Sequence, residues 1–200
     1  MTTLEIQATT GTVFRIGGVG PTANGQHGGL RYVWQSLAGA GSVSARVASP
    51  TGTSGAAEAG VMFRQGLGTQ APYYYASVSP GAGIRVAYRA KTGAPTIAIA
   101  HASGAAPAYL RVSHTSGVYI AYTSSDGTTW TAIKGSRVSV RMGDTLQAGM
   151  AVTGHGGRTQ DTATFDTVSV SGASRSLSPR VYRAQTRSRR TSKRGRRTGR

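Results

Sequence analysis

Apolar and polar side chains alternate along most of this chain, in short runs that glycine-rich turns separate. In Ala108–His114, Leu110 and Val112 alternate with polar or half-polar neighbours, as expected for a strand with one buried face. In Gly83–Ala90, apolar and basic positions alternate in the same way. The strands expected from this pattern are Thr12–Ile16, Leu30–Leu37, Ser42–Ala48, Ala59–Gln65, Tyr73–Ser79, Gly83–Ala90, Thr96–His101, Ala108–His114, Gly117–Thr123, Thr128–Lys134, Arg137–Met142, Leu146–Thr153 and Thr162–Ser171. Strands recurring about every 8–12 residues, with no helical period, predict an antiparallel β-sandwich or barrel.

Two connections carry specific turn signals. Asp126-Gly127 lies between two predicted strands and offers the positive-φ positions that a tight hairpin needs. Pro80 and Gly81 occupy turn positions between Tyr73–Ser79 and the next strand. These turns predict that neighbouring strands pair as hairpins.

The alternation stops at Ser171, and the charge changes there too. The chain carries a formal net charge of +17, and the segment Gly172–Arg200 holds eleven Lys and Arg residues and no acid. A segment so charged and so poor in large apolar residues cannot offset its ordering entropy. We therefore expect one β-domain over residues 1–171 and a disordered, arginine-rich tail over residues 172–200.

The tail is expected to bind polyanions by charge and not by sequence, because phosphate neutralisation needs no reading surface. Nonspecific nucleic acid and anionic polysaccharide are the partners that suit it. The tail residues expected to make these contacts are Arg187, Arg189, Arg190, Lys193, Arg194, Arg196, Arg197 and Arg200.

Five segments resemble one family of domains. They are Gly41–Ser49, Glu58–Gly66, Tyr73–Arg89, Tyr109–Thr131 and Leu146–Ser171. Their order and spacing resemble the concanavalin A-like, laminin-G-like domains of bacterial secreted proteins and glycoside hydrolases. The resemblance implies a jelly-roll of two packed antiparallel sheets and a carbohydrate-binding or adhesive role.

The resemblance also bears on individual residues. Arg64 matches a family position and is the best single polar candidate for a ligand contact. His155 matches a turn histidine of the family and is expected either to contact a ligand at the rim of the sheet or to bond the backbone of its own turn. The stretch Gly17–Leu30 departs from the family, because relatives often carry aspartates there and this chain has none. A ligand or cation role of that stretch is therefore not expected here.

Basic and aromatic residues are predicted to gather on one sheet face. Arg85 and Arg89 share a face of one strand, and Tyr73 and Tyr75 share a face of the strand before it. If these strands pair through the Pro80 turn, the rings and guanidinium groups lie side by side. Aromatic rings stack on sugar C–H faces, and arginine forks bind hydroxyl or carboxylate groups. We therefore expect a glycan-binding face at Tyr73, Tyr75, Arg85 and Arg89, or alternatively an ordinary solvated face.

Catalysis and metal binding have weaker support. A glycosidase usually needs two carboxylates roughly 5–10 Å apart, and the six acidic residues of this chain show no such spacing pattern in the sequence. The chain has no cysteine, and its histidines lack metal-ligand spacing. No cofactor is expected. Ca²⁺, held by Asp144, Asp161 and loop carbonyls, is an alternative without a motif.

The first hypothesis for the function is a non-catalytic, carbohydrate-binding (lectin-like) module whose basic tail adds affinity for an anionic partner. The main alternative is a structural or decoration protein of a phage or virus particle, whose basic arm contacts nucleic acid or a neighbouring subunit. A glycoside hydrolase is the weaker alternative. The N-terminus shows no secretory signal, and no apolar run approaches the ~20 residues of a membrane span. The expected location is extracellular or on a virion.

Overall fold

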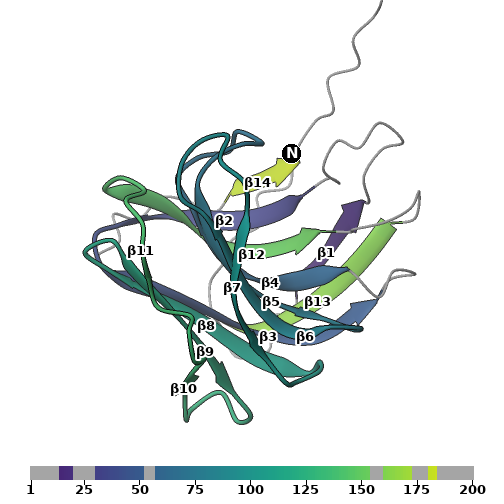
Figure 1. The fold of residues 1–200 in the computed structure, drawn as a ribbon. Helices are drawn as coiled ribbons and strands as arrows, with labels where there is room; N and C mark the ends of the chain where they lie inside the picture. Colours follow the sequence, from purple (N-terminus) through teal and green to yellow (C-terminus); the bar gives the residue numbers. More distant parts are fainter. Residues whose placement is uncertain (1–13, 20–29, 52–56, 154–159, 173–179, 184–200) are drawn as a thin grey trace, which may run out of the picture.

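The protein is a two-layer β-sandwich. The computed structural model describes residues 14–19, 30–51, 57–153, 160–172 and 180–183. In these residues fourteen strands form two antiparallel sheets of seven strands each, which lie face to face (Figure 1). The all-β fold predicted from the alternation, and the two antiparallel sheets that the family resemblance implies, are therefore confirmed. Among the described residues, no helix is long and apolar enough to cross a membrane.

The first sheet, sheet A, has the strand order β1-β13-β3-β8-β9-β10, and β11 pairs separately with β9. Its strands are β1 (Phe14–Val19), β3 (Gly41–Thr51), β8 (Ala108–Thr115), β9 (Val118–Ser124), β10 (Thr131–Ala132), β11 (Val138–Ser139) and β13 (Gln160–Gly172).

The second sheet, sheet B, has the order β14-β2-β12-β4-β5-β6-β7. Its strands are β2 (Arg31–Ala38), β4 (Glu58–Arg64), β5 (Tyr73–Ser79), β6 (Gly83–Arg89), β7 (Ile97–Ala102), β12 (Thr145–Thr153) and β14 (Arg180–Arg183). Hairpins join β4 to β5, β5 to β6 and β6 to β7, so these strands are neighbours in space as well as in sequence.

The core lies between the sheets and follows the alternation. Leu110 and Val112 of β8 are fully buried, as the sequence predicts. Three aromatic rings meet at the centre: Tyr119 stacks on Tyr74 with 5.3 Å between ring centroids and meets Phe63 edge-on at 5.8 Å. Each sheet thus buries one face in the core and leaves the other as an outer face on which a ligand can be bound.

Strand β14 was not predicted. It lies within the segment expected to be disordered and pairs antiparallel with β2, Val181 opposite Val33 and Tyr182 opposite Tyr32. The expectation of disorder is therefore wrong for Arg180–Arg183. The physical reason is that β2 would otherwise be an edge strand, whose free backbone groups can pair even with a short, basic segment. The rest of the tail lies outside the described residues.

Two predicted strands are much shorter than expected. The predicted strands Thr128–Lys134 and Arg137–Met142 shrink to the two-residue strands β10 and β11. Asp126 draws the backbone N–H groups of Thr128 and Thr129 into its own turn, at 2.8 Å each, so they are not free for strand pairing. Local side-chain capture by an aspartate thus overrides the alternation at the start of Thr128–Lys134.

Candidate functional site

The outer face of sheet B brings together most of the predicted ligand residues. Arg64 of β4, Tyr73 of β5 and Arg89 of β6 stand directly opposite one another in register, so they form one row across three strands. Residues opposite each other in an antiparallel pair point to the same side of the sheet. Tyr75 and Arg85 lie two and four positions along their strands from this row and therefore share its face. The predicted juxtaposition of rings and guanidinium groups is found.

Tyr73, Arg89 and Thr96 form a polar cluster at the solvent side of this face, called here the Tyr73 patch. The Tyr73 hydroxyl lies 2.7 Å from the Thr96 hydroxyl, and Arg89 donates to Thr69 O at 3.2 Å and to Thr96 Oγ1 at 3.5 Å. The Arg89 guanidinium carbon lies 5.3 Å from the centre of the Tyr73 ring. Tyr73 and Arg89 are half-buried, and Thr96 is exposed. The patch presents a ring, a cation and hydroxyl groups on a preformed surface.

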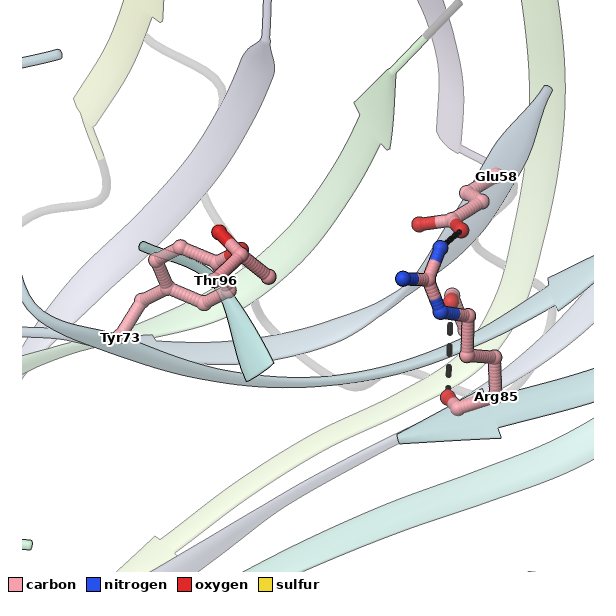
Figure 2. Close-up of polar contacts among 5 residues, drawn as sticks. Glu58, Tyr73, Arg85 and Thr96 are labelled. Carbon is pink, nitrogen blue, oxygen red and sulfur yellow. Dashed lines mark hydrogen bonds and ion pairs between the residues drawn. The ribbon is translucent and has the colours of Figure 1, made fainter. Parts of the chain in front are cut away.

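Arg85 is held by an acid. Its Nη1 lies 2.9 Å from Glu58 Oε1, and the two side chains are 33% and 11% exposed (Figure 2). Figure 2 also shows that this ion pair is separate from the contact between Tyr73 and Thr96. Because Glu58 already neutralises Arg85, an incoming ligand would have to compete with a carboxylate for this guanidinium.

The structure corrects the expectation for Tyr75. Its side chain is only 3% exposed and packs with Tyr32, Trp34, Met62 and Ala151 in a second apolar cluster on the outer face of sheet B. Its hydroxyl donates to Ala151 O at 3.0 Å, and burial raises its pKa well above the usual value. An enclosed ring offers no face for stacking, so Tyr75 supports the sheet instead of presenting itself to a ligand.

The expectation for Arg64 needs a similar correction. Arg64 is 4% exposed, and its Nε donates to Gly66 O at 2.6 Å while Nη2 donates to Gly68 O. Both acceptors belong to the loop between β4 and β5, which leads directly to Tyr73. Arg64 therefore positions this loop beneath the Tyr73 patch and does not present an open fork.

Two further residues of this face were not predicted as site residues from the sequence. Gln147 of β12 stands opposite Arg64 and so extends the row of Tyr73 and Arg89. Trp34 of β2 lies on the same outer face. The enclosed atoms Gln147 Oε1 and Trp34 Nε1 have no hydrogen-bond partner among the described residues. The alternation of β2 and β12 was the available signal, because it places both side chains opposite the core-facing Val33 and Ala148.

The described carboxylates lie on different surfaces. Glu58 pairs with Arg85 on the outer face of sheet B, whereas Asp166 pairs with Arg46 at 2.7 Å on sheet A. Asp126 closes its own turn, and the backbone donors of Thr128 and Thr129 hold its pKa well below the usual range. Each of these acids has a structural partner, and no two of them face each other across one surface.

The calcium alternative and one ligand candidate receive no structural description. Asp144 is exposed near the end of the sandwich, while the side chain of Asp161 lies outside the described residues, as does His155. Within the described ranges, no three His, Asp or Glu side chains gather as metal ligands would.

A pocket of about 930 Å³ opens at one end of the sandwich, between the β2–β3 turn, the β8–β9 turn and residues 139–144. His114 forms its inner wall. Its Nδ1 lies 3.2 Å from Gly39 O, and its Nε2 accepts the Gly117 N–H at 3.1 Å, which fixes a neutral ring protonated at Nδ1. Burial lowers the pKa of His114. Because both ring nitrogens are engaged by backbone, His114 has no free atom to offer a substrate.

Comparison with known proteins supports the fold. No protein-family model matches the chain, and no curated protein sequence matches it. A functionally unknown protein from Saccharomyces cerevisiae has a similar structure, with a TM-score of 0.57 and 17% identity over 83% of this chain and 94% of that one.

Two weaker structural similarities involve enzymes. A GH43 protein from Bacillus licheniformis gives a TM-score of 0.47 and 19% identity over 64% of this chain and 26% of that chain. A β-1,3-1,4-glucanase (lichenase) derived from a mouse hindgut metagenome gives a TM-score of 0.45 and 10% identity over 77% of each chain.

Proposed function

We propose that this protein binds carbohydrate, without cleaving it, at the Tyr73 patch on the outer face of sheet B. The observation that carries the proposal is the half-buried Tyr73 ring with the Arg89 guanidinium 5.3 Å from its centre and the Thr96 hydroxyl at its rim. A pyranose presents both an apolar C–H face and a ring of hydroxyl groups. One half-exposed ring flanked by donors and an acceptor suits both features.

The patch is ordered before any ligand arrives. Thr96 holds the Tyr73 hydroxyl, and the Thr69 carbonyl holds Arg89. Arg64 fixes the loop that contains Thr69, through the carbonyls of Gly66 and Gly68. A surface whose side chains are already fixed loses little conformational entropy on binding, which favours affinity.

The arrangement of acids supports binding over hydrolysis. Glycoside hydrolysis requires two carboxyl groups on either side of one scissile bond. Glu58, the acid described on the outer face of sheet B, is committed to Arg85, and Asp166 lies on the other sheet. Among the residues that the structure describes, the Tyr73 patch therefore has the groups to hold a sugar but no carboxylate pair to cleave one.

The test begins with a glycan array and continues with calorimetric titration of the best ligand. Loss of an aromatic or arginine anchor typically costs about 2 kcal/mol, or about 30-fold in Kd. Tyr73→Ala and Arg89→Ala should each weaken binding by about that factor without lowering the melting temperature appreciably. Arg137→Ala, which removes an exposed arginine between β10 and β11, is the matched control and should leave Kd unchanged. Unchanged Kd in both patch variants would contradict the proposal.

The charge distribution favours a second function for the C-terminal segment. Eleven Lys and Arg residues without an acid between Gly172 and Arg200 suit nonspecific binding of polyanions, including nucleic acid. This role is compatible with a secreted lectin-like module and with a structural protein of a phage or virus particle. Analytical sedimentation of the protein with and without DNA would distinguish the secreted module from the particle protein. Only the particle protein should form an oligomer of defined size when DNA is added.

A further inference from the structure

The outer face of sheet A carries a second cluster of rings and guanidinium groups. The Arg111 guanidinium carbon lies 3.8 Å from the centre of the Trp130 ring, a stacking distance. Tyr122 of β9 stands directly opposite Arg111 of β8, and both side chains are half-buried. Because residues 109, 111 and 113 face away from the core, this cluster lies on the opposite side of the sandwich from the Tyr73 patch.

Among the described residues, Arg111 is a cation without a counterion. None of the hydrogen bonds or ion pairs among the described residues involves its guanidinium, and its Nε is enclosed without a partner. Burial lowers the pKa of Arg111, which expresses the cost of holding this charge against the indole ring without an acceptor. By contrast, Arg46 on the adjacent strand β3 is neutralised by Asp166 at 2.7 Å. Among the described side chains of β3 and β8, Arg111 is therefore the guanidinium that no carboxylate balances.

The surrounding charges indicate what kind of anion would fit. Asp166 and the ionised Asp126 lie in segments on either side of β8, since β13 is two strands away and the Asp126 turn packs its Gly127 against Tyr109. The Asp166 charge is already offset by Arg46, so Arg111 offers a single guanidinium, which suits one anionic group better than a chain of phosphates. A carboxylate matches the planar arginine fork in a bidentate geometry.

The rings around Arg111 indicate what carries that carboxylate. Tyr122 and Tyr109 flank Arg111 with half-buried rings, and Ser44 stands opposite it on β3. We propose that Arg111, Trp130 and Tyr122 form a second binding site, for a pyranose unit that bears a carboxylate, that is, a hexuronate residue. The carboxylate takes the guanidinium fork, and the C–H face of the sugar lies against the Tyr122 ring. This inference does not depend on the Tyr73 patch.

The test follows the indole N–H signal of Trp130 by NMR while glucuronate is added to the full-length protein. The chain has two tryptophans, so Trp130→Phe assigns the signal. Glucuronate should shift the Trp130 indole N–H signal in a saturable way. The neutral methyl ester of glucuronate should leave this signal unchanged. Arg111→Gln should weaken glucuronate binding at least tenfold, whereas Arg137→Gln, which removes the same charge elsewhere, should have no effect. Both variants keep the basic tail, so its contribution cancels.

Several results would overturn the proposal. An equal response to the methyl ester would exclude the carboxylate, and an equal response to inorganic phosphate would exclude the sugar. A response to short single-stranded DNA but not to glucuronate would assign the surface to nucleic acid. If Arg111→Gln does not fold, Arg111→Lys is used, and it should weaken binding because a lysine lacks the fork. Tyr73→Ala should leave the Trp130 response unchanged, so failure of this site and failure of the Tyr73 patch are distinguishable.

Discussion

Tyr75 and Tyr73 lie on the same face of β5, and substitutions should show that they have different roles. The Tyr75 side chain is 3% exposed among Tyr32, Trp34 and Met62, and its hydroxyl donates to Ala151 O. Truncating a buried aromatic side chain costs about 3–5 kcal/mol. Tyr75→Ala should lower the free energy of unfolding by about that amount, whereas Tyr75→Phe loses one hydrogen bond and should cost about 1 kcal/mol.

Denaturant unfolding of the full-length protein measures these differences, and Tyr73→Ala is the matched control. Tyr73 is half-buried and loses one exposed hydrogen bond to Thr96, so its free energy of unfolding should fall by less than about 1 kcal/mol. In thermal unfolding, Tyr75→Ala should melt lower by roughly 6–20 °C, from about 2–4 °C per kcal/mol. The burial argument would be refuted if Tyr75→Ala were as stable as Tyr73→Ala and had lost glycan binding instead.

Three further outcomes are expected from other parts of the molecule. Gly149→Ala should destabilise the domain by about 1–3 kcal/mol in denaturant unfolding, because a Cβ there overlaps the Val33 backbone, while Gly66→Ala meets nothing and should be neutral. Because the pKa of His114 is lower in the folded than in the unfolded chain, stability should be full above about pH 6.5 and fall below it. Unfolding at a series of pH values should show that slope in His101→Gln but not in His114→Gln. Deleting residues 184–200 should abolish most binding of duplex DNA, and intact protein should lose affinity by orders of magnitude between low and moderate salt.

The strand pattern could be predicted from sequence wherever one face of a strand is buried. The bounds of β5 match the prediction without a shift, and β8 and β12 differ by one residue at one end. In these strands a change of register by one residue would expose the apolar set, so alternation specifies them strongly. Strand β14 could not be predicted, because its four residues show no alternation of apolar and polar side chains. It forms through backbone pairing with the edge of β2, which the local sequence does not reveal.

The sequence predicted which sheet face carries the candidate site, but not which residues of that face are exposed to a ligand. Alternation showed that Tyr73, Tyr75, Arg85 and Arg89 share one side of the sheet, and the register confirms that placement. How deeply a side chain on that face is buried depends on neighbours that are distant in the sequence. Tyr75 is enclosed by residues of β2, β4 and β12, and no local pattern reports such contacts.

The sequence also did not show which charged side chains form ion pairs. The Glu58–Arg85 pair joins residues 27 positions apart, and Arg46 and Asp166 are 120 positions apart. Composition counted these charges correctly but could not show that they neutralise each other. The unbalanced charge of Arg111 becomes visible only when the paired arginines are known.

A map of backbone amide shifts tests the central claim most directly. The best neutral glycan from the array is added to labelled full-length protein, and the amide signals are followed by NMR. Carbohydrate binding at the outer face of sheet B predicts saturable shifts centred on Tyr73, Arg89 and Thr96, which Tyr73→Ala abolishes. Shifts centred on the end pocket at residues 114–117 and 139–144, with no change around Tyr73, would contradict the account.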